Sequence, residues 1–488
     1  MKKILKQKNS MGIDMKILIN RILFLLLLFA ISFPSKMIAQ ETDIAGSWQG
    51  ALKVSGIQLR IVFNILKSDD GNLKATMDSP DQGANDIPVE KATLTGNKIK
   101  LEMPKLKGEY NGILSDDGSK ISGKWSQAGQ TFNLDLEKKD KPIVVNRPQE
   151  PKKPYPYNSA DITFKNEEAG ITLAGTFTSP KEEGPFPAVI LITGSGAQNR
   201  NEELLGHKPF LVLSDYLTKK GIAVLRYDDR GTAKSTGDFK SATSEDFATD
   251  VMAAIKYLKT RDDVKKDEIG LIGHSEGGLI APIVATKSDD VAFIVMMAGP
   301  GLPGDQILLM QSALIDRANG ESEEDILKST EVSKKIYQVI KSGKDSTEAY
   351  DEIKQILSKT FVSLSDEDKK EIGSKENMYK NIASILSPWF INFITYDPRP
   401  TLEKVECPVL AINGEKDLQV PPKEDIEEIE KALKNGGNEN YKTEILPGLN
   451  HLFQTAETGS PIEYNKIEET ISPIALKTIG DWILEITK

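Results

Sequence analysis

Apolar and polar positions alternate in the first part of the chain. Between residues 44 and 136 the period is two over short runs, such as 59–65, 98–102 and 132–136. Turn sequences separate these runs, among them Asp-Asp-Gly-Asn at 69–72. Short alternating strands joined by tight turns, without helical periodicity, predict a small antiparallel β domain, either a sandwich or a barrel.

From residue 161 onward the pattern changes to a hairpin followed by continuous apolar runs and amphipathic segments. Runs that are apolar on both faces and alternate with helices are typical of a mostly parallel sheet covered on both sides. The apolar runs lie at 188–192, 222–227, 269–273 and 292–297, and the helical patterns between them at 210–220 and 244–259.

Residues 303–395 contain no strand pattern, whereas helical patterns cover 325–341 and 379–393. Strand patterning resumes at residue 408. Ligands of such sheets bind at the carboxyl edge of the strands, so we expect the helical insertion to form a cap over that edge. A peripheral helical layer without substrate contact is the alternative.

These patterns predict an α/β fold with a separate β domain before it. The β domain and the α/β part are joined by a linker in which closely spaced prolines favour extended backbone. The predicted parts are a signal peptide at 1–39, an antiparallel β domain at 40–137, a proline-rich linker at 138–160, a catalytic α/β domain at 161–302 and 396–488, and a helical cap at 303–395.

The N-terminal segment has the order of a secretory signal peptide. Lys16 and Arg21 precede the apolar run 22–31, and Ala39 offers a small residue for cleavage. We therefore expect export to the periplasm or the extracellular space, with no stable membrane association after cleavage. An uncleaved N-terminal anchor is the alternative.

Composition excludes several classes of function. The 488 residues carry a formal net charge of −10, and Lys and Arg are scattered without a basic stripe, so we expect no nucleic-acid partner. Cys407 is the single cysteine, which excludes an internal disulfide; it precedes an apolar run at 408–412 and is predicted to be a small core residue. No metal-binding motif is present, and we expect neither metal nor cofactor.

The sequence Gly-His-Ser-Glu-Gly at 273–277 connects an apolar strand to a helix. A serine at such a turn is held at the edge of the sheet above a helix N-terminus, where a nucleophile would be exposed. A chance match in a glycine-rich turn is the alternative for this motif alone. A nucleophilic Ser275 requires a base within hydrogen-bonding reach and a carboxylate that orients the base.

The chain offers three histidines as candidate bases. His451 lies in the loop after a late strand and shares the sheet edge with Ser275, so we predict that it is the base. His274 adjoins Ser275 in a tight turn and is expected to be structural, and His207 is expected to cap a helix or lie at the surface.

Asp417 is the predicted carboxylate of the set. It follows the strand at 408–412, and Glu415 is its competitor two residues earlier. Asp417 is preferred because the turn at Gly414 needs length before a side chain can return over the sheet. The resulting chain order is Ser, Asp, His, with each residue after a successive strand.

An oxyanion formed at Ser275 would need two N–H donors. The amide of Glu276 follows the nucleophile, and the amide of Ser195 is the preferred second donor, with Gly196 as the alternative. Asp229 and Arg230 are expected to form a buried ion pair that braces this region, although both could reach the site. Possible substrate-loop residues are Gly194, Gly196, Gln198 and Arg200.

With these motifs the chain resembles bacterial α/β-hydrolases of the esterase and serine-aminopeptidase-like group. The resemblance is carried by the motifs at 193–196, 226–231, 273–278, 413–417 and 448–451, and it covers about residues 161–488. It implies the α/β-hydrolase fold and favours hydrolysis of carboxylic esters over peptides. The sequence departs from the group at Ala233, where relatives usually have glycine, and we expect a small change of loop shape there.

The predicted function is hydrolysis of a small-molecule ester through an acyl-enzyme on Ser275. Three alternatives stay open: an exopeptidase with the same three residues, an acyltransferase that passes the acyl group to an acceptor other than water, and a binding protein in which the three residues are no longer active.

Overall fold

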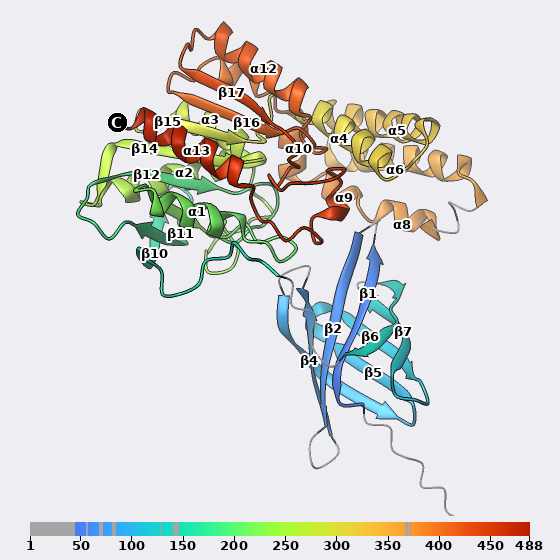
Figure 1. The fold of residues 1–488 in the computed structure, drawn as a ribbon. Helices are drawn as coiled ribbons and strands as arrows, with labels where there is room; N and C mark the ends of the chain where they lie inside the picture. The colour runs from blue at the N-terminus through green and yellow to red at the C-terminus, as the bar shows by residue number, and fades with distance from the viewer. Residues whose placement is uncertain are drawn as a thin grey trace, which may run out of the picture. The chain divides into compact units, whose positions relative to one another are not determined.

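A computed structural model describes residues 44–488, except for 55–56, 68–71, 81–83, 128, 140–145, 367–368 and 370–371. The predicted signal peptide lies outside the described residues. Figure 1 shows an antiparallel β domain and a mixed sheet covered by helices. Among the helices described, none combines the length and apolar character needed to cross a membrane.

The β domain is a barrel. Its strands follow the order β6-β5-β4-β3-β2-β1-β9-β7-β8 and pair antiparallel, and pairing of β6 with β7 closes the sheet. The bounds are β1 (Gly46–Val54), β2 (Ile57–Lys67), β3 (Leu73–Ser79), β4 (Ala84–Thr95), β5 (Lys98–Met103), β6 (Gly108–Leu114), β7 (Lys120–Gln127), β8 (Gln130–Asn133) and β9 (Leu136–Lys139).

Aromatic side chains fill the barrel core. Trp48, Tyr110 and Trp125 are buried, with exposed fractions of 0%, 0% and 2%. The Tyr110 hydroxyl donates to the carbonyl of Leu134 at 3.0 Å. Its ring needs Gly123 beneath it, because a Cβ there would lie 2.4 Å from the hydroxyl. These aromatic residues are therefore packing residues of the core.

The strand predicted at 132–136 is two strands in the structure. β8 ends at Asn133 and β9 begins at Leu136. Between them the Leu134 side chain is fully buried, and its amide donates to the carbonyl of Gly123 at 2.9 Å. β8 pairs with β7, whereas β9 pairs with both β1 and β7. The barrel accordingly runs to Lys139.

The second sheet has the order β10-β11-β13-β12-β14-β15-β16-β17. β10 and β11 pair antiparallel with their neighbours, and the strands from β13 to β17 are parallel. This topology is the α/β-hydrolase fold that the sequence predicts. The bounds are β10 (Asn158–Asn166), β11 (Ile171–Ser179), β12 (Phe186–Ile192), β13 (Ala223–Tyr227), β14 (Val264–His274), β15 (Phe293–Met297), β16 (Val409–Gly414) and β17 (Tyr441–Leu446).

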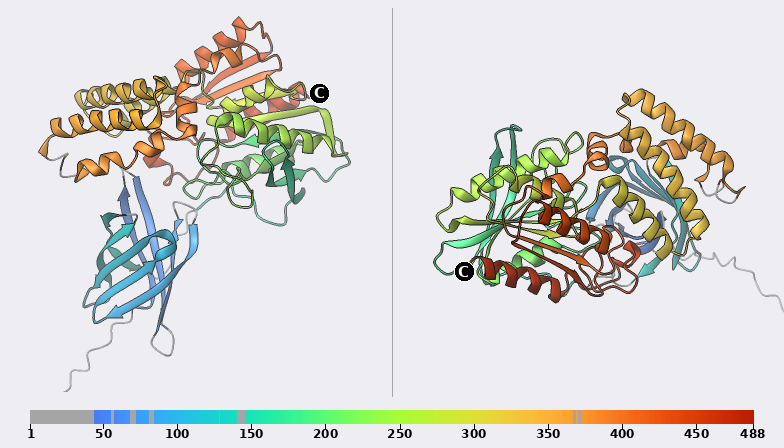
Figure 2. Two further views of the ribbon diagram at one scale, coloured as in Figure 1. Left: turned by 180° about the vertical axis from the view of Figure 1, so that it is seen from behind. Right: turned by 90° about the horizontal axis from the view of Figure 1, so that it is seen from above.

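Helices cover both faces of this sheet, as Figures 1 and 2 show. One face packs on α2 (Ser244–Lys259), α3 (Glu276–Ala285) and α12 (Pro422–Asn435). The other packs on α1 (Pro209–Lys219) and α13 (Pro473–Ile486). The central strands β12, β14 and β15 are buried over most of their length because apolar side chains leave both faces. The loops that follow the carboxyl ends of these strands therefore start from a rigid layer.

The segment between β15 and β16 is helical, with a small apolar core of its own. The helix predicted at 379–393 is interrupted, because Pro388 begins a new helix and Ser387 caps it by accepting from the amide of Phe390 at 3.3 Å. Figure 2 shows these helices in yellow to orange, side by side. They are α4 (Gly304–Ala318), α5 (Glu323–Lys341), α6 (Ser346–Ser363), α8 (Lys375–Tyr379), α9 (Ile382–Ile385) and α10 (Pro388–Thr395).

The described part of the linker, residues 146–157, is fastened to the α/β part. The Arg147 guanidinium donates to the carbonyls of Leu205 at 3.0 Å and Ile467 at 2.7 Å. The Gln149 side chain donates to the carbonyl of Ile471 at 2.6 Å and accepts from the same residue's amide at 3.1 Å. These contacts connect two loops of the α/β part through the linker, whose backbone turns at Arg147–Glu150, where the amide of Glu150 donates to the carbonyl of Arg147 at 3.1 Å.

Candidate active site

Ser275 lies between β14 and α3, on a strained turn. Its backbone is left-handed (φ 52°, ψ −117°), and its amide donates to the carbonyl of Met297 at 2.8 Å. The turn requires glycine on both sides. A Cβ at Gly273 would lie 1.9 Å from the carbonyl oxygen of Gly277, and a Cβ at Gly277 would lie 2.2 Å from that of Ile192. Ser275 is half-buried, whereas the residues beside it are buried.

His451 and Asp417 form a buried hydrogen-bonded pair. His451 Nδ1 lies 2.7 Å from Asp417 Oδ2, and the exposed fractions are 4% and 1%. The other carboxylate oxygen accepts from the amides of Gln419 at 2.7 Å and Val420 at 3.0 Å. Asp417 therefore has a fixed orientation and supports the tautomer in which the other ring nitrogen of His451 is free to act as a base.

Glu415, the competing carboxylate, lies elsewhere. Its side chain is exposed and accepts from the amide of Gly448 at 2.8 Å. It supports the turn that precedes His451. The loop itself is held by Asn450, whose buried side-chain oxygen accepts from the amides of Leu452 at 3.0 Å and Gln454 at 2.9 Å.

The glycine-rich loop after β12 reaches Ser275. A Cβ added to Gly194 would lie 3.2 Å from the Ser275 Cβ. The loop is fixed on both sides of Ser195, because the Gly194 amide donates to Glu202 at 2.7 Å and the Gln198 amide donates to Asp229 at 2.8 Å. Gly196 lies between them with φ +94° and open space where a Cβ would stand. The segment carrying the Ser195 amide is thus exposed and firmly anchored.

The Glu276 amide is the first N–H of α3 and has no preceding helical turn to receive it. The Glu276 side chain has contacts of its own, separate from its amide. The buried carboxylate accepts from the Ser244 hydroxyl at 2.7 Å and from Trp389 Nε1 of α10 at 2.8 Å. Burial raises the pKa of Glu276, although both hydrogen bonds oppose the shift. The contact joins the cap helices to the turn of Ser275.

Arg200, a possible substrate-loop residue, is occupied by protein partners. Its guanidinium donates to both oxygens of Asp228, at 3.0 and 2.7 Å, and to the carbonyl of Gly175 at 2.6 Å. It braces the loop from behind. Gln198 contributes its amide to the same bracing, and its side chain donates weakly to the carbonyl of Ser195 at 3.4 Å.

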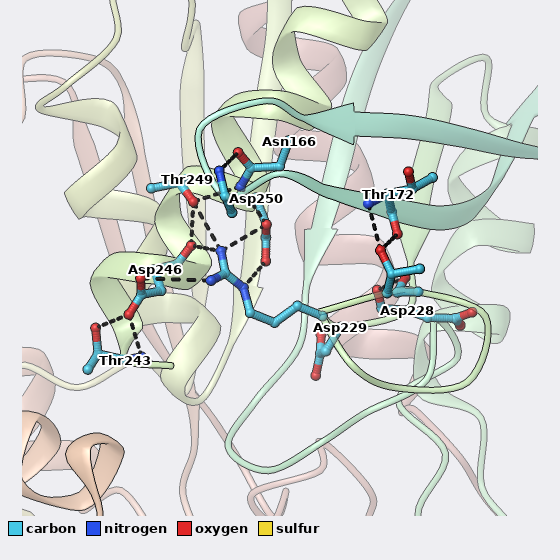
Figure 3. A network of polar contacts seen from close by, with 12 residues as sticks. Asn166, Thr172, Asp228, Asp229, Thr243, Asp246, Thr249 and Asp250 are labelled. Atoms are coloured by element: carbon cyan, nitrogen blue, oxygen red, sulfur yellow. Dashed lines mark hydrogen bonds and ion pairs between the residues drawn. The ribbon is translucent and has the colours of Figure 1, made fainter. Parts of the chain in front are cut away.

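Asp229 and Arg230 do not pair with each other, which corrects the ion pair expected from the sequence. Figure 3 shows the Asp229 carboxylate pointing away from the network around Asp250. Arg230 Nε donates to Asp250 Oδ2 at 2.7 Å, and Asp229 accepts from the Thr193 hydroxyl at 2.7 Å and from Gln198. Each residue braces a different loop. Burial raises the pKa of Asp229 to about 8.

Ala233, the departure from the glycine found in relatives, keeps a glycine-like backbone. Its φ is 47°, in the left-handed region that alanine adopts at a cost. The neighbouring Ser235 hydroxyl donates to the carbonyl of Asp228 at 2.6 Å, and its Oγ accepts from the amide of Ala174 at 2.9 Å. The loop is therefore held in place by its contacts, and the alanine carries backbone strain.

The two other histidines are buried. His207 is fully buried, contrary to its expected capping or surface role. Its Nε2 lies 2.9 Å from the carbonyl of Tyr464 and its Nδ1 lies 3.1 Å from the Thr470 hydroxyl. His274 lies between the carbonyl of His451 and the carboxylate of Glu202. Sequence reasoning missed Glu202, because a glutamate in a loop carries no pattern that distinguishes it from a surface residue.

Within the described residues, no group of His, Cys, Asp and Glu side chains is placed to hold a metal ion.

Comparison with known proteins places the sequence among hydrolases. A family model described as X-Pro dipeptidyl-peptidase (S15 family) matches residues 169–446, more than half of the chain. Esterase EstD of Thermotoga maritima is 29% identical over 334 residues, which cover 68% of this chain and 69% of EstD. Among solved structures, the Pyrococcus furiosus esterase Pf2001 aligns with a TM-score of 0.40 at 17% identity, covering 71% of this chain and 100% of that one. Est1E of Butyrivibrio proteoclasticus, solved with ferulic acid bound, has a TM-score of 0.40 at 20% identity, covering 67% and 100%.

Proposed function

The chain belongs to the X-Pro dipeptidyl-peptidase (S15) family and is a hydrolase, and we propose that it cleaves small carboxylic esters through an acyl-enzyme on Ser275. One observation carries the proposal. The buried pair of Asp417 and His451 lies in loops that leave the same sheet edge as the turn of Ser275. These are the three groups that acyl transfer by a serine requires.

In the proposed reaction His451 takes the hydroxyl proton of Ser275 as the oxygen attacks the ester carbonyl. Asp417 stays ionised, holds the ring of His451 and stabilises the imidazolium that forms. The amides of Glu276 and Ser195 donate to the oxyanion. His451 then gives its proton to the leaving alcohol. A water molecule releases the acyl group by the same steps, with His451 as the base.

One relative favours ester cleavage over peptide cleavage: EstD, which aligns along about two thirds of both chains, is named an esterase. The family description names a peptidase activity, which is the alternative. An ester also makes the smaller demand on this site, since its alcohol leaves more readily than an amine. The same three residues could serve an acyltransferase or a peptidase, so the substrate must be tested directly.

The test compares matched substrates. We expect turnover of p-nitrophenyl acetate and butyrate, and a kcat/KM for Ala-Pro-p-nitroanilide lower by at least about 10²-fold. Ser275→Ala should lose ester turnover by at least about 10³-fold. A preference for the anilide would contradict the ester proposal and establish an X-Pro peptidase. Undiminished ester turnover by Ser275→Ala would contradict the role of Ser275.

We also propose that the protein is exported. The basic, apolar and small-residue order of residues 16–39 supports this. Expression of the full chain in a bacterial host, followed by N-terminal sequencing of the periplasmic protein, tests it. A mature start at Gln40 is expected, whereas full-length protein confined to the cytoplasm would contradict the proposal.

A further inference from the structure

We propose that Glu202 and His274 form a charged positioning pair that couples the oxyanion loop to the loop of His451. The inference rests on the proposed function, because it assigns these residues a task in the same site. Neither residue touches the reacting atoms in the mechanism above. Both are buried beside them, with exposed fractions of 5% and 6%.

One carboxylate oxygen connects the two loops. Glu202 Oε1 accepts from the amide of Gly194 at 2.7 Å and from His274 Nδ1 at 2.9 Å. The other ring nitrogen of His274 donates to the carbonyl of His451 at 3.0 Å. A continuous chain of hydrogen bonds therefore runs from the residue before Ser195 to the backbone of the predicted base. His274 itself immediately precedes Ser275.

The hydrogen-bond pattern defines the charge on His274. A carbonyl oxygen can only accept, so Nε2 must carry a proton. Nδ1 faces an oxygen of the Glu202 carboxylate, and an ionised carboxylate can only accept, so in the proposed pair Nδ1 is a donor as well. Both protons are present only in the imidazolium form. Burial is the largest single influence and opposes this charge, but the Glu202 carboxylate, the hydrogen bond to the carbonyl of His451 and the charge of Asp417 together raise the pKa of His274.

The arrangement has a cost that packing alone does not explain. Glu202 adopts a left-handed backbone (φ 50°), and within the described part of the chain its Oε2 is buried without a hydrogen-bond partner. The His274 and His451 rings are 5.0 Å apart between centroids. A structural element under this strain beside a nucleophile is typical of a functional constraint. We attribute it to fixing the oxyanion donor and the base relative to Ser275.

The first experiment measures kcat and KM separately for Glu202→Gln. The amide keeps the shape and removes the charge. We expect kcat for p-nitrophenyl acetate to fall by about 10²-fold, as for other losses of alignment, with KM changed less than threefold. The kcat of His274→Gln should fall similarly, and the kcat of the double variant should fall no further than that of the worse single variant. Additive losses would contradict a coupled pair.

Asp425→Asn is the matched control. Asp425 is also buried and accepts from two amides, those of Gly301 and Leu302, and among the described residues its second oxygen has no hydrogen-bond partner. We expect it to lower the melting temperature about as much as Glu202→Gln while kcat stays within threefold. Equal losses of kcat in both variants would reduce Glu202 to a structural role. Loss of activity in Ser275→Ala with full kcat in Glu202→Gln would overturn this inference and leave the proposed function intact.

A measurement on the unmodified protein covers the case in which the variants do not fold. The chain has three histidines, so their ring ¹⁵N signals can be resolved and assigned. At pH 7.5 we expect two protonated nitrogens on His274, whose signals are assigned through the backbone coupling of His274 to Ser275. A neutral His274 ring at this pH would overturn the charged pair.

Discussion

At the scale of single residues, the site depends on groups whose orientation the backbone fixes. Ser275 holds a left-handed conformation that costs about 1–3 kcal/mol for a non-glycine residue. The turn brings Gly273 so close to Gly277 that a Cβ on Gly273 would lie 1.9 Å from the carbonyl oxygen of Gly277, and this tight packing holds Ser275 in its conformation. The orientation of Asp417 is fixed likewise, because one carboxylate oxygen accepts from two amides and the other lies against Nδ1 of His451.

The Asp417→Asn variant tests the orientation of His451. An amide can present its N–H to the ring and favour the wrong tautomer. We expect kcat for ester hydrolysis to fall by about 10⁴-fold with little change in melting temperature. Glu415→Gln is the control, because Glu415 lies two residues away and its exposed side chain accepts from the amide of Gly448. A larger loss in the Glu415 variant would assign the carboxylate role to Glu415.

Asp229 makes stability depend on pH. Its folded pKa is about 8 because of burial, against about 3.9 in an unfolded chain. Between these values the folded state holds a proton that the unfolded state has released, so the free energy of unfolding falls as pH rises from about 4 to about 8. The slope for one proton is at most about 1.4 kcal/mol per pH unit.

We expect Asp229→Asn to remove this fall in the free energy of unfolding with rising pH. Urea unfolding at intervals from about pH 5 to about pH 8 measures it. The amide can keep both contacts, because the Thr193 hydroxyl can turn to accept from it. Asp161→Asn is the control, since the pKa of Asp161 is lowered, chiefly by the Thr176 hydroxyl. A slope unchanged by Asp229→Asn would show that the carboxyl ionises near its ordinary pKa when folded.

At the scale of elements, the site is made by loops that follow successive parallel strands. β12 leads to the glycine-rich loop, β14 to Ser275, β16 to Asp417 and β17 to His451. The α/β-hydrolase fold could be predicted because these strands are apolar on both faces and end in turn sequences. The choice of Asp417 over Glu415 followed from the length of its turn. The contact with His451 agrees with that choice, while the catalytic role stays a prediction.

Features decided by tertiary contacts could not be predicted. The break before Pro388 required knowing that Ser387 would cap a new helix, although the proline itself was a signal. Burial of His207 depends on Tyr464 and Thr470, more than 250 residues away. The partner of Arg230 is Asp250 on α2, which no local spacing distinguishes from Asp229.

Trp389 tests whether the cap acts on the site. Its Nε1 donates to the buried Glu276 carboxylate, and Trp389→Phe removes that donor while keeping an aromatic ring. We expect kcat/KM for p-nitrophenyl butyrate to fall about tenfold, since loss of one buried hydrogen bond costs about 1–2 kcal/mol. Phe390→Leu, in the same helix, is the control. An equal fall in kcat/KM for Trp389→Phe and Phe390→Leu would show that α10 only packs there and that its hydrogen bond does not influence the turn of Ser275.

At the scale of the whole molecule, the β barrel and the α/β part have separate apolar cores. The barrel core includes Phe63 and Leu101, and the sheet of the α/β part packs residues such as Ile190 and Ile412 on its two faces. Each core is large enough to stabilise a domain. Chemistry at Ser275 should therefore depend on one of these cores and tolerate damage to the other.

Leu101→Ala tests this independence. Leu101 is fully buried in the barrel, and the truncation should cost the barrel about 2–5 kcal/mol. We expect calorimetry to show one transition at a lower temperature, with kcat for p-nitrophenyl acetate unchanged below that transition. Ile190→Ala, in the α/β core, should lower the other transition. A loss of kcat caused by Leu101→Ala in the folded protein would show that the barrel supports the site.

The most direct test of the central claim is labelling with a fluorophosphonate followed by peptide mapping. We predict one adduct per chain, on Ser275, with a labelling rate that falls by at least about 10³-fold in His451→Ala. Ester turnover should disappear in proportion to the label. An adduct on another residue, or turnover that survives complete labelling of Ser275, would contradict the account.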